Sequence, residues 1–135
     1  MHGEINYWQV FKENHFFGHK REVKSLGNYR LFKQPEGEYV TMTAGIRRKT
    51  LVHGDKTILC KFKLDQGTLL PLHSHPHEQT GYLLSGNLVF IIAGESHEVK
   101  TGDSWSIKAG VEHGAEIVED TTLIEVFSPV REDYL

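Results

Sequence analysis

The chain has 135 residues, of which 39% are apolar and 10% aromatic, and its formal net charge at pH 7 is −3. This length is sufficient for one domain with its own core, and the composition is that of a folded chain rather than a disordered one. A slightly acidic chain lacks the basic surface of a nucleic-acid-binding protein, and no apolar run approaches the roughly 20 residues that cross a membrane. The N-terminus lacks the basic-then-apolar pattern of a secretion signal, and the single cysteine, Cys60, cannot form an internal disulfide. We therefore expect a cytoplasmic protein with neither a nucleic-acid nor a membrane partner.

The first 43 residues stand apart because aromatic side chains are concentrated there. Leaving so many rings in water would create an apolar patch. We therefore expect an N-terminal arm over residues 1–43, with one short helix or a few edge strands. It packs either on the main body, residues 44–135, or on the second subunit of a homodimer. The aromatic residues of this arm are Tyr7, Trp8, Phe11, Phe16, Phe17, Tyr29, Phe32 and Tyr39.

From residue 44 onward the sequence predicts short strands. In TILCKFKL, residues 57–64, apolar side chains alternate with lysines, which is typical of a strand with one buried face. Further strand-like segments follow, and pairs such as Ser85-Gly86, Thr101-Gly102 and Glu119-Asp120 separate them. Without a helical period between these segments, the pattern indicates an all-β antiparallel sandwich or barrel. A jelly roll is the natural closed form, and its central cavity would be lined by alternate residues of the strands.

The spacing of His73, His75 and His113 indicates a metal site. Residues two apart in a strand point to the same face, so His73 and His75 can present two imidazoles to one cavity. His113 follows a turn at Gly110 and can fold back against them; a hydrogen-bonding role for His113 is the alternative. Imidazole ligands favour Zn, Ni, Cu, Co or Fe over Mg or Ca. The histidine at position 77 shares the parity of the pair and is a reserve ligand, although the preceding proline would turn it toward the rim.

The C-terminal segment LIEVFSPVREDYL, residues 123–135, carries a second set of candidate site residues. Glu125 and Phe127 have the same strand parity, so both can face the cavity, and Pro129 ends the strand. Arg131 can then fold back over the mouth and bind a carboxylate through two parallel hydrogen bonds. These residues predict a site for a small anionic substrate with Glu125 as general acid or base. The alternatives are a surface ion pair for Glu125, a core position for Phe127 and a solvated tail for Arg131.

Two segments together resemble the paired sequence motifs of the cupin family. The matching positions are Gly67, His73, His75, Gln79 and Gly86 in the first motif and Gly102, Gly110 and His113 in the second. The family usually has Glu at the position of Gln79 and Pro at the position of Lys108, and often Asn at that of Ile117. The resemblance implies a single-domain cupin jelly-roll β-barrel, to which the aromatic-rich arm is added.

The same resemblance implies that one divalent transition-metal ion (Zn, Ni, Fe, Co or Cu) is held by four side chains, those of His73, His75, Gln79 and His113. Because none of these ligands is charged, the ion keeps its full charge and attracts anions. If the strand were displaced by one residue, Glu78 would take the place of Gln79.

The segments HSHPHEQ, GDSWSI and VFSPVREDYL are similar to the small cupins related to the pectin-degradation protein KdgF. That group opens 4,5-unsaturated monouronates to linear 5-keto-4-deoxyuronate. The similarity implies that Glu125, Phe127 and Arg131 occupy the group's acidic, aromatic and arginine site positions, of which the acidic one is often Asp. We therefore expect a metal-dependent enzyme with isomerase- or lyase-like activity on a small acidic sugar. The alternatives are a metal-dependent cupin dioxygenase and a non-catalytic cupin that binds a small molecule.

Overall fold

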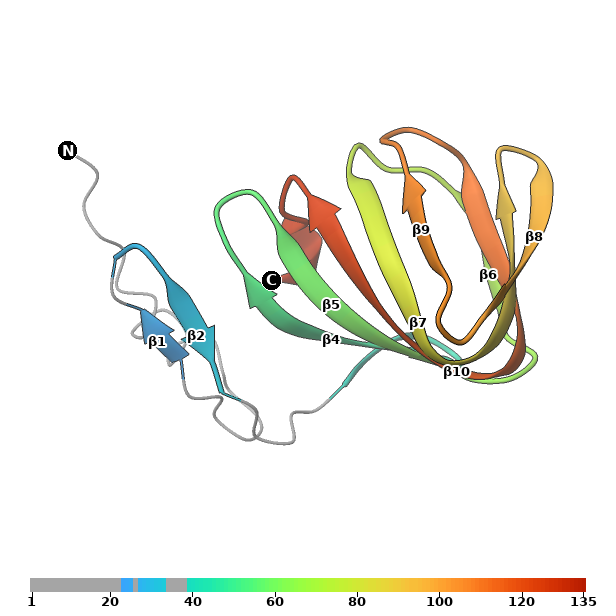
Figure 1. The fold of residues 1–135 in the computed structure, drawn as a ribbon, viewed down its shortest axis with the longest axis horizontal. Helices are drawn as coiled ribbons and strands as arrows, with labels where there is room; N and C mark the ends of the chain where they lie inside the picture. Colours follow the sequence, from blue (N-terminus) through green and yellow to red (C-terminus); the bar gives the residue numbers. More distant parts are fainter. Residues whose placement is uncertain (1–22, 26, 34–38) are drawn as a thin grey trace.

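A computed structural model describes residues 23–25, 27–33 and 39–135 (Figure 1). About two thirds of the described residues lie in β-strands, and their one helical element is a short 3-10 helix, η1 (Glu132–Tyr134). The predicted all-β class is confirmed, and within the described residues no helix is long and apolar enough to span a membrane. Most of the aromatic residues of the expected arm lie outside the described residues, so its packing on the barrel or on a second subunit stays a prediction.

Ten strands make up the described sheets. Two of them, β1 (Val23–Ser25) and β2 (Arg30–Phe32), form a separate antiparallel pair. The others form one eight-stranded sheet and are β3 (Val40–Thr43), β4 (Ile46–His53), β5 (Ile58–Leu64), β6 (Leu69–His73), β7 (Glu78–Ile92), β8 (Glu95–Lys100), β9 (Ser104–Ile107) and β10 (His113–Ser128). The expected boundary at residue 44 falls between β3 and β4, which pair through Val40 and Arg48.

Strands β7 and β10 run through both layers of the molecule and pair with each other along their length. One half of each pairs with β5 or β9, and the other half pairs with β6 or β8. The sheet therefore folds over on itself into the two layers of a jelly roll, and Figure 1 shows both strands curving from one layer to the other.

The bend in these strands corrects one expectation from the sequence. The pair Ser85-Gly86 was expected to separate two strands, as was Glu119-Asp120, yet β7 and β10 each continue through the pair. Register shifts interrupt the β10 ladder between Ile117 and Leu123, and Gly86 on the facing strand has a φ of +113°. Bulges and a glycine with positive φ bend a strand without ending its hydrogen bonding, so the two motifs stay connected across the fold.

The core lies between the two layers. Alternate residues of β5 are buried, which confirms the predicted alternation, and Cys60 has no exposed surface, as expected of a small core residue. Both layers contribute further large apolar side chains, among them Leu83, Leu88, Phe90, Ile117, Leu123 and Phe127. Because the inward faces of β7 and β10 supply half of the buried core residues, they also position the polar residues that interrupt the core.

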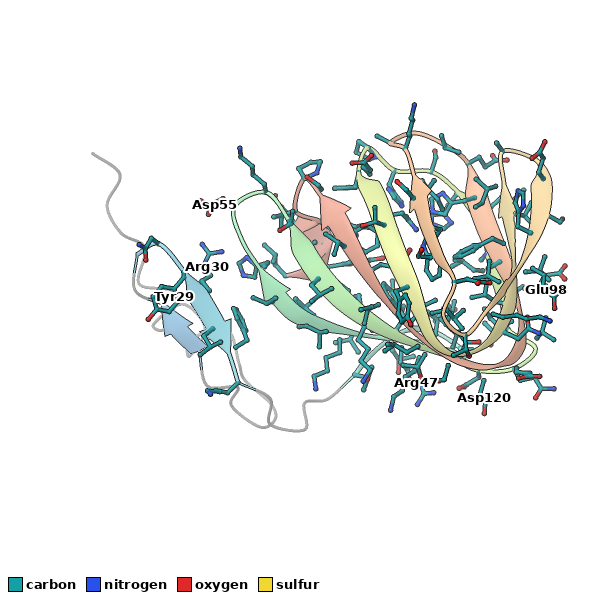
Figure 2. The ribbon with its side chains drawn as sticks, viewed as in Figure 1. Tyr29, Arg30, Arg47, Asp55, Glu98 and Asp120 are labelled. Atoms are coloured by element: carbon teal, nitrogen blue, oxygen red, sulfur yellow. The ribbon has the colours of Figure 1, made fainter. Side chains whose placement is uncertain are left out.

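The β1–β2 pair contacts the end of β4 and the turn after it through Arg30 and Phe32. Arg30 Nη1 donates to the carbonyl oxygen of His53 at 3.0 Å, and its Nη2 lies 3.4 Å from Asp55 Oδ1. The rings of Phe32 and His53 lie 5.9 Å apart. Figure 2 shows Arg30 between the small sheet and the β4–β5 turn. This contact lies away from the cavity described below.

Candidate metal centre and active site

Three histidines from two segments meet inside the jelly roll. His73 ends β6 and His113 begins β10, and the two are direct cross-strand partners with ring centroids 4.3 Å apart. The ring of His75 lies 5.7 Å from that of His73 and 5.0 Å from that of His113. One ring nitrogen of each lies within 4.8 Å of one nitrogen of each of the others. The structure thus brings together the histidines that the sequence predicted would converge.

The backbone determines which nitrogen of each ring is free. In all three rings Nδ1 contacts the carbonyl oxygen of a residue two positions away, at 2.9 Å for Pro71 and His73, 2.9 Å for His77 and His75, and 2.8 Å for Val111 and His113. A carbonyl oxygen only accepts, so Nδ1 carries the proton and Nε2 keeps its lone pair. This is the arrangement in which an outer hydrogen bond orients a metal-binding histidine.

The histidine centre contains an unpaired buried acceptor. Nε2 of His75 is buried and has no hydrogen-bond partner among the described residues. Leaving such a group without a partner costs about 1–3 kcal/mol, which a cation at this position would offset. Burial lowers the pKa of His75, with smaller contributions from Arg131 and His113. Burial likewise lowers the pKa of His113, so both rings favour the neutral form that binds metals.

Gln79 is oriented by a hydrogen bond to Glu125. It lies near the start of β7, is 4% exposed, and donates from Nε2 to Glu125 Oε2 at 2.6 Å. In this hydrogen bond the NH₂ group faces Glu125, so the amide oxygen faces away from it. Gln79 lines the same cavity as the three histidines, and it acts to raise the pKa of His75, against the effect of burial. Three imidazoles and one amide oxygen therefore form a donor set that can hold a metal ion.

Glu125 is the buried carboxyl group of the site. It lies on β10 opposite Cys60 of β5 and Gly81 of β7, and it is 8% exposed. Its Oε2 accepts a second hydrogen bond, from Trp105 Nε1 at 2.9 Å. Burial raises the pKa of Glu125 to about 7, while the hydrogen bonds from Trp105 and Gln79 and the charge of Arg131 act in the opposite direction.

Phe127 and Arg131 form the wall beside the histidines. The Phe127 ring is buried and lies 5.8 Å from the ring of His75. The Arg131 side chain is only 14% exposed and lies 5.1 Å from the Phe127 ring. Its Nη2 donates to Asp133 Oδ2 at 2.8 Å. Phe127 is thus both a core residue and part of the site, and Arg131 is not a solvated tail.

One cavity contains all of these groups. Its volume is about 70 Å³ when only the space open to the centres of water molecules is counted. This is room for a few waters. Polar residues gather on part of its wall, namely His73, His75, Gln79, His113, Glu125 and Arg131, and apolar ones such as Phe62, Leu88 and Leu123 line the rest. A few convergent polar groups in an otherwise apolar cavity are typical of a small-molecule site.

The comparison with known families now decides the identity. The sequence model of the cupin domain matches residues 60–127, which is half of the chain and includes both histidine segments. This chain is a cupin. The cupin is 31% identical over 108 residues to the pectin degradation protein KdgF of Dickeya dadantii (strain 3937), which covers 78% of this chain and 98% of that protein.

Solved structures agree with this assignment. The structure of KdgF from Halomonas sp. is 31% identical, with a TM-score of 0.70, over 73% of this cupin and 91% of that chain. An RmlC-like cupin from Shewanella frigidimarina NCIMB 400 is 29% identical, with a TM-score of 0.71, over 74% and 90% of the two chains. Salicylate 1,2-dioxygenase from Pseudoaminobacter salicylatoxidans, at 18% identity and a TM-score of 0.61, shares the fold. The chain is therefore a small cupin similar to KdgF.

The alternative ligands lie elsewhere in the cupin. Glu78 is exposed while Gln79 is buried, so the strand is not displaced by one residue. The ring of His77 lies 5.5 Å from that of His75, and its buried Nδ1 has no partner among the described residues, but it is not part of the three-histidine cluster. His97, on β8, is exposed.

Sequence reasoning missed two aromatic residues of this site. Trp105 supplies the second hydrogen bond to Glu125. Tyr134 lines the cavity, with the guanidinium carbons of Arg131 and Arg48 lying 3.9 Å and 4.1 Å from the centre of its ring. Its carbonyl oxygen accepts from Thr50 Oγ1 at 2.7 Å, which ties the end of the chain to β4. The sequence offers one signal for each residue, the strand parity of Trp105 and the position of Tyr134 near the C-terminus. Neither signal indicates which residue the side chain contacts.

Proposed function

We propose that this cupin is a metal-dependent enzyme that opens 4,5-unsaturated monouronates to linear 5-keto-4-deoxyuronate. The observation that carries the proposal is that Glu125 and Arg131 line the same cavity as the three-histidine cluster. A carboxyl group, a guanidinium group and three imidazoles thus face one space, as proton transfer, carboxylate binding and metal binding would require. The 31% identity to a pectin degradation protein across nearly its whole length supports a uronate as substrate.

The proposed metal ligands are the three histidines and the amide oxygen of Gln79. Their donor set fits Zn, Ni, Fe, Co or Cu, because imidazole nitrogens suit these ions. When bound, the ion supplies a positive charge that polarises substrate oxygen atoms and favours anions. Because all four side chains are neutral, the centre would carry more positive charge than one that includes a carboxylate ligand.

The conversion is an isomerisation whose protons can pass through one carboxyl group. The bond between C1 and the ring oxygen breaks, and the hydroxyl group on C1 loses its proton as the aldehyde forms. C4 gains a proton as C5 becomes a ketone, so the formula is unchanged. Glu125 accepts the first proton and delivers the second, which needs a carboxyl group inside the cavity and screened from bulk water.

Arg131 and Phe127 hold the substrate in this proposal. Arg131 presents a guanidinium group to the cavity, which suits the carboxylate of a uronate. Asp133 already restrains it through Nε and Nη2, so little side-chain freedom is lost when substrate binds. Phe127 supplies an apolar wall beside the histidines, against which a sugar ring can pack.

The direct test is turnover. Protein purified without a chelating tag is incubated with the unsaturated monouronate released by an alginate or pectate lyase, and the loss of ultraviolet absorbance of the C4=C5 bond is followed. We expect loss of the double bond with wild type and at least about 100-fold slower loss with Glu125→Gln. A wild-type rate equal to that in buffer, with each candidate metal added in turn, would refute the proposal. Oxygen consumption in the same assay would indicate the dioxygenase instead.

A further inference from the structure

The Trp105 side chain packs on the sheet at a position where the facing residue has to be glycine. It is half-buried on β9 and is the cross-strand partner of Gly81 on β7. A Cβ atom on Gly81 would lie within 3.0 Å of three atoms of the Trp105 indole, Cε2, Cζ2 and Nε1. Gly81 is not among the glycines with positive φ, so its backbone does not require glycine. The missing side chain therefore makes room for the indole.

The indole so placed reaches across β7 to Glu125. Gly81 is also the cross-strand partner of Glu125 on the other side of the strand, and Trp105 Nε1 donates to Glu125 Oε2 at 2.9 Å. Phe90 also packs against the indole, with ring centroids 4.9 Å apart. Trp105 is thus packed in one orientation, with its single polar atom directed at the carboxyl group.

Both donors to Glu125 use the same oxygen atom. Gln79 Nε2 and Trp105 Nε1 contact Oε2, at 2.6 Å and 2.9 Å, and no donor among the described residues reaches Oε1. Since Oε1 has no such donor and is not among the fully buried polar atoms, it keeps some accessible surface. Because Glu125 lines the cavity and keeps 8% of its surface exposed, Oε1 is the oxygen that faces the open space.

We infer that Trp105, seated against Gly81, is a positioning residue that holds Oε2 of Glu125 so that Oε1 carries the proton transfer. The catalytic part of this inference rests on the proposed function; the positioning part does not. Two donors on one oxygen prevent the carboxyl group from rotating and keep its free oxygen toward the substrate. A displacement of about 1 Å at such a group can cost as much as about 100-fold in rate.

The first experiment needs neither substrate nor metal. The chain has two tryptophans, so a Trp8→Phe background leaves one indole N–H signal in a nitrogen–proton correlation spectrum. We expect this proton to exchange slowly with solvent and to exchange at least about tenfold faster in Glu125→Ala, which removes its acceptor. Should Glu125→Ala fail to fold, Gly81→Ala provides the same test by displacing the indole. Unchanged exchange and unchanged chemical shift in a folded variant would overturn the inference.

The second experiment measures turnover of the unsaturated monouronate. Trp105→Phe keeps an aromatic ring but removes the donor, and we expect kcat to fall about tenfold or more while KM and metal content stay within about twofold. Gly81→Ala should behave alike, whereas Ser104→Ala, the exposed neighbour on the same strand, should match wild type. Wild-type kcat in Trp105→Phe would overturn the inference, as would a fall in kcat that only follows lost metal.

The two experiments separate this inference from the proposed function. If wild type does not convert the uronate, the proposed function fails, and the exchange of the indole proton still decides whether Trp105 holds Glu125. If wild type converts the uronate but the exchange rate of the indole proton does not depend on Glu125, the proposed function stands and the positioning role is wrong.

Discussion

Gln79 donates its amide hydrogen to Glu125 from inside the cavity, at 2.6 Å. This contact explains why an amide stands where the cupin motif usually has a carboxylate. An amide offers an oxygen for a metal and an N–H for Glu125, whereas a carboxylate offers acceptors to both. Gln79 therefore links the neutral set of metal donors to the buried carboxyl group of Glu125.

Gln79→Glu should destabilise the metal-free protein. The change removes a buried donor and puts two carboxyl groups in contact, so we expect the free energy of unfolding to fall by about 2–3 kcal/mol. Urea unfolding in the presence of a chelator measures it. Glu78→Gln, an exposed change on the adjacent residue, should alter stability by no more than about 0.5 kcal/mol. Equal midpoints for Gln79→Glu and wild type would contradict the described contact.

Arg131→Lys should weaken substrate binding although it keeps the charge. Lysine lacks the planar group that lies 3.9 Å from the Tyr134 ring and bonds Asp133 through two nitrogens. We expect KM for the unsaturated monouronate to rise about tenfold. Arg47→Lys is the matched control, because that arginine pairs with Asp65 on the exposed surface, away from the cavity (Figure 2). An unchanged KM in Arg131→Lys would remove this residue from the substrate site.

Cys60 should resist thiol reagents in the folded protein. Burial raises the pKa of its thiol from 9.0 to about 11, with the Thr50 hydrogen bond opposing this. The folded state therefore favours the thiol, and its contribution to stability is complete below about pH 9 and is lost as the pH rises toward 11. We expect labelling by a maleimide at pH 8 only after denaturation, read by mass spectrometry. Rapid labelling of the folded chain would show that the β5 core opens readily.

Gly86→Ala should destabilise the bend of β7. Its φ is +113°, and a Cβ atom would meet the carbonyl oxygen of Asp120 at 2.6 Å. Gly102→Ala isolates the backbone effect, because Gly102 has a φ of +94° and open space around it. We expect losses of about 3 kcal/mol for Gly86→Ala and about 1 kcal/mol for Gly102→Ala in urea unfolding. Equal losses would mean that the close approach of β10 does not matter.

Sequence patterns over a few residues predict much of the fold. The alternation in β5 predicted its buried face. The prediction that His73 and His75 face one cavity is also right, but its reason is not, because β6 ends at His73 and His75 lies in the loop that follows. At Ser85-Gly86 the sequence predicts the end of a strand, but Gly86 bends β7 without ending it. A single sequence does not distinguish these outcomes, because they depend on whether the partner strand continues alongside.

The residues that sequence reasoning missed depend on register. Trp105 reaches Glu125 only because β9 pairs with β7 so that the indole lies against Gly81. Tyr134 lines the cavity only because the chain folds back after β10 and bonds Thr50. Neither pairing leaves a local signal, since both join segments far apart in the chain. The histidine centre was easier to foresee, because its residue type is itself a chemical signal.

Metal analysis of the protein purified without a chelating tag tests the central claim most directly. We predict about one transition-metal ion per chain in wild type and at least about 100-fold weaker metal binding in His75→Ala, since this variant loses the buried Nε2. His97→Ala, on the exposed strand β8, should retain the metal. Equal metal in wild type and His75→Ala, or none in wild type after exposure to each candidate ion, would contradict the claim that these side chains form a metal-dependent active site.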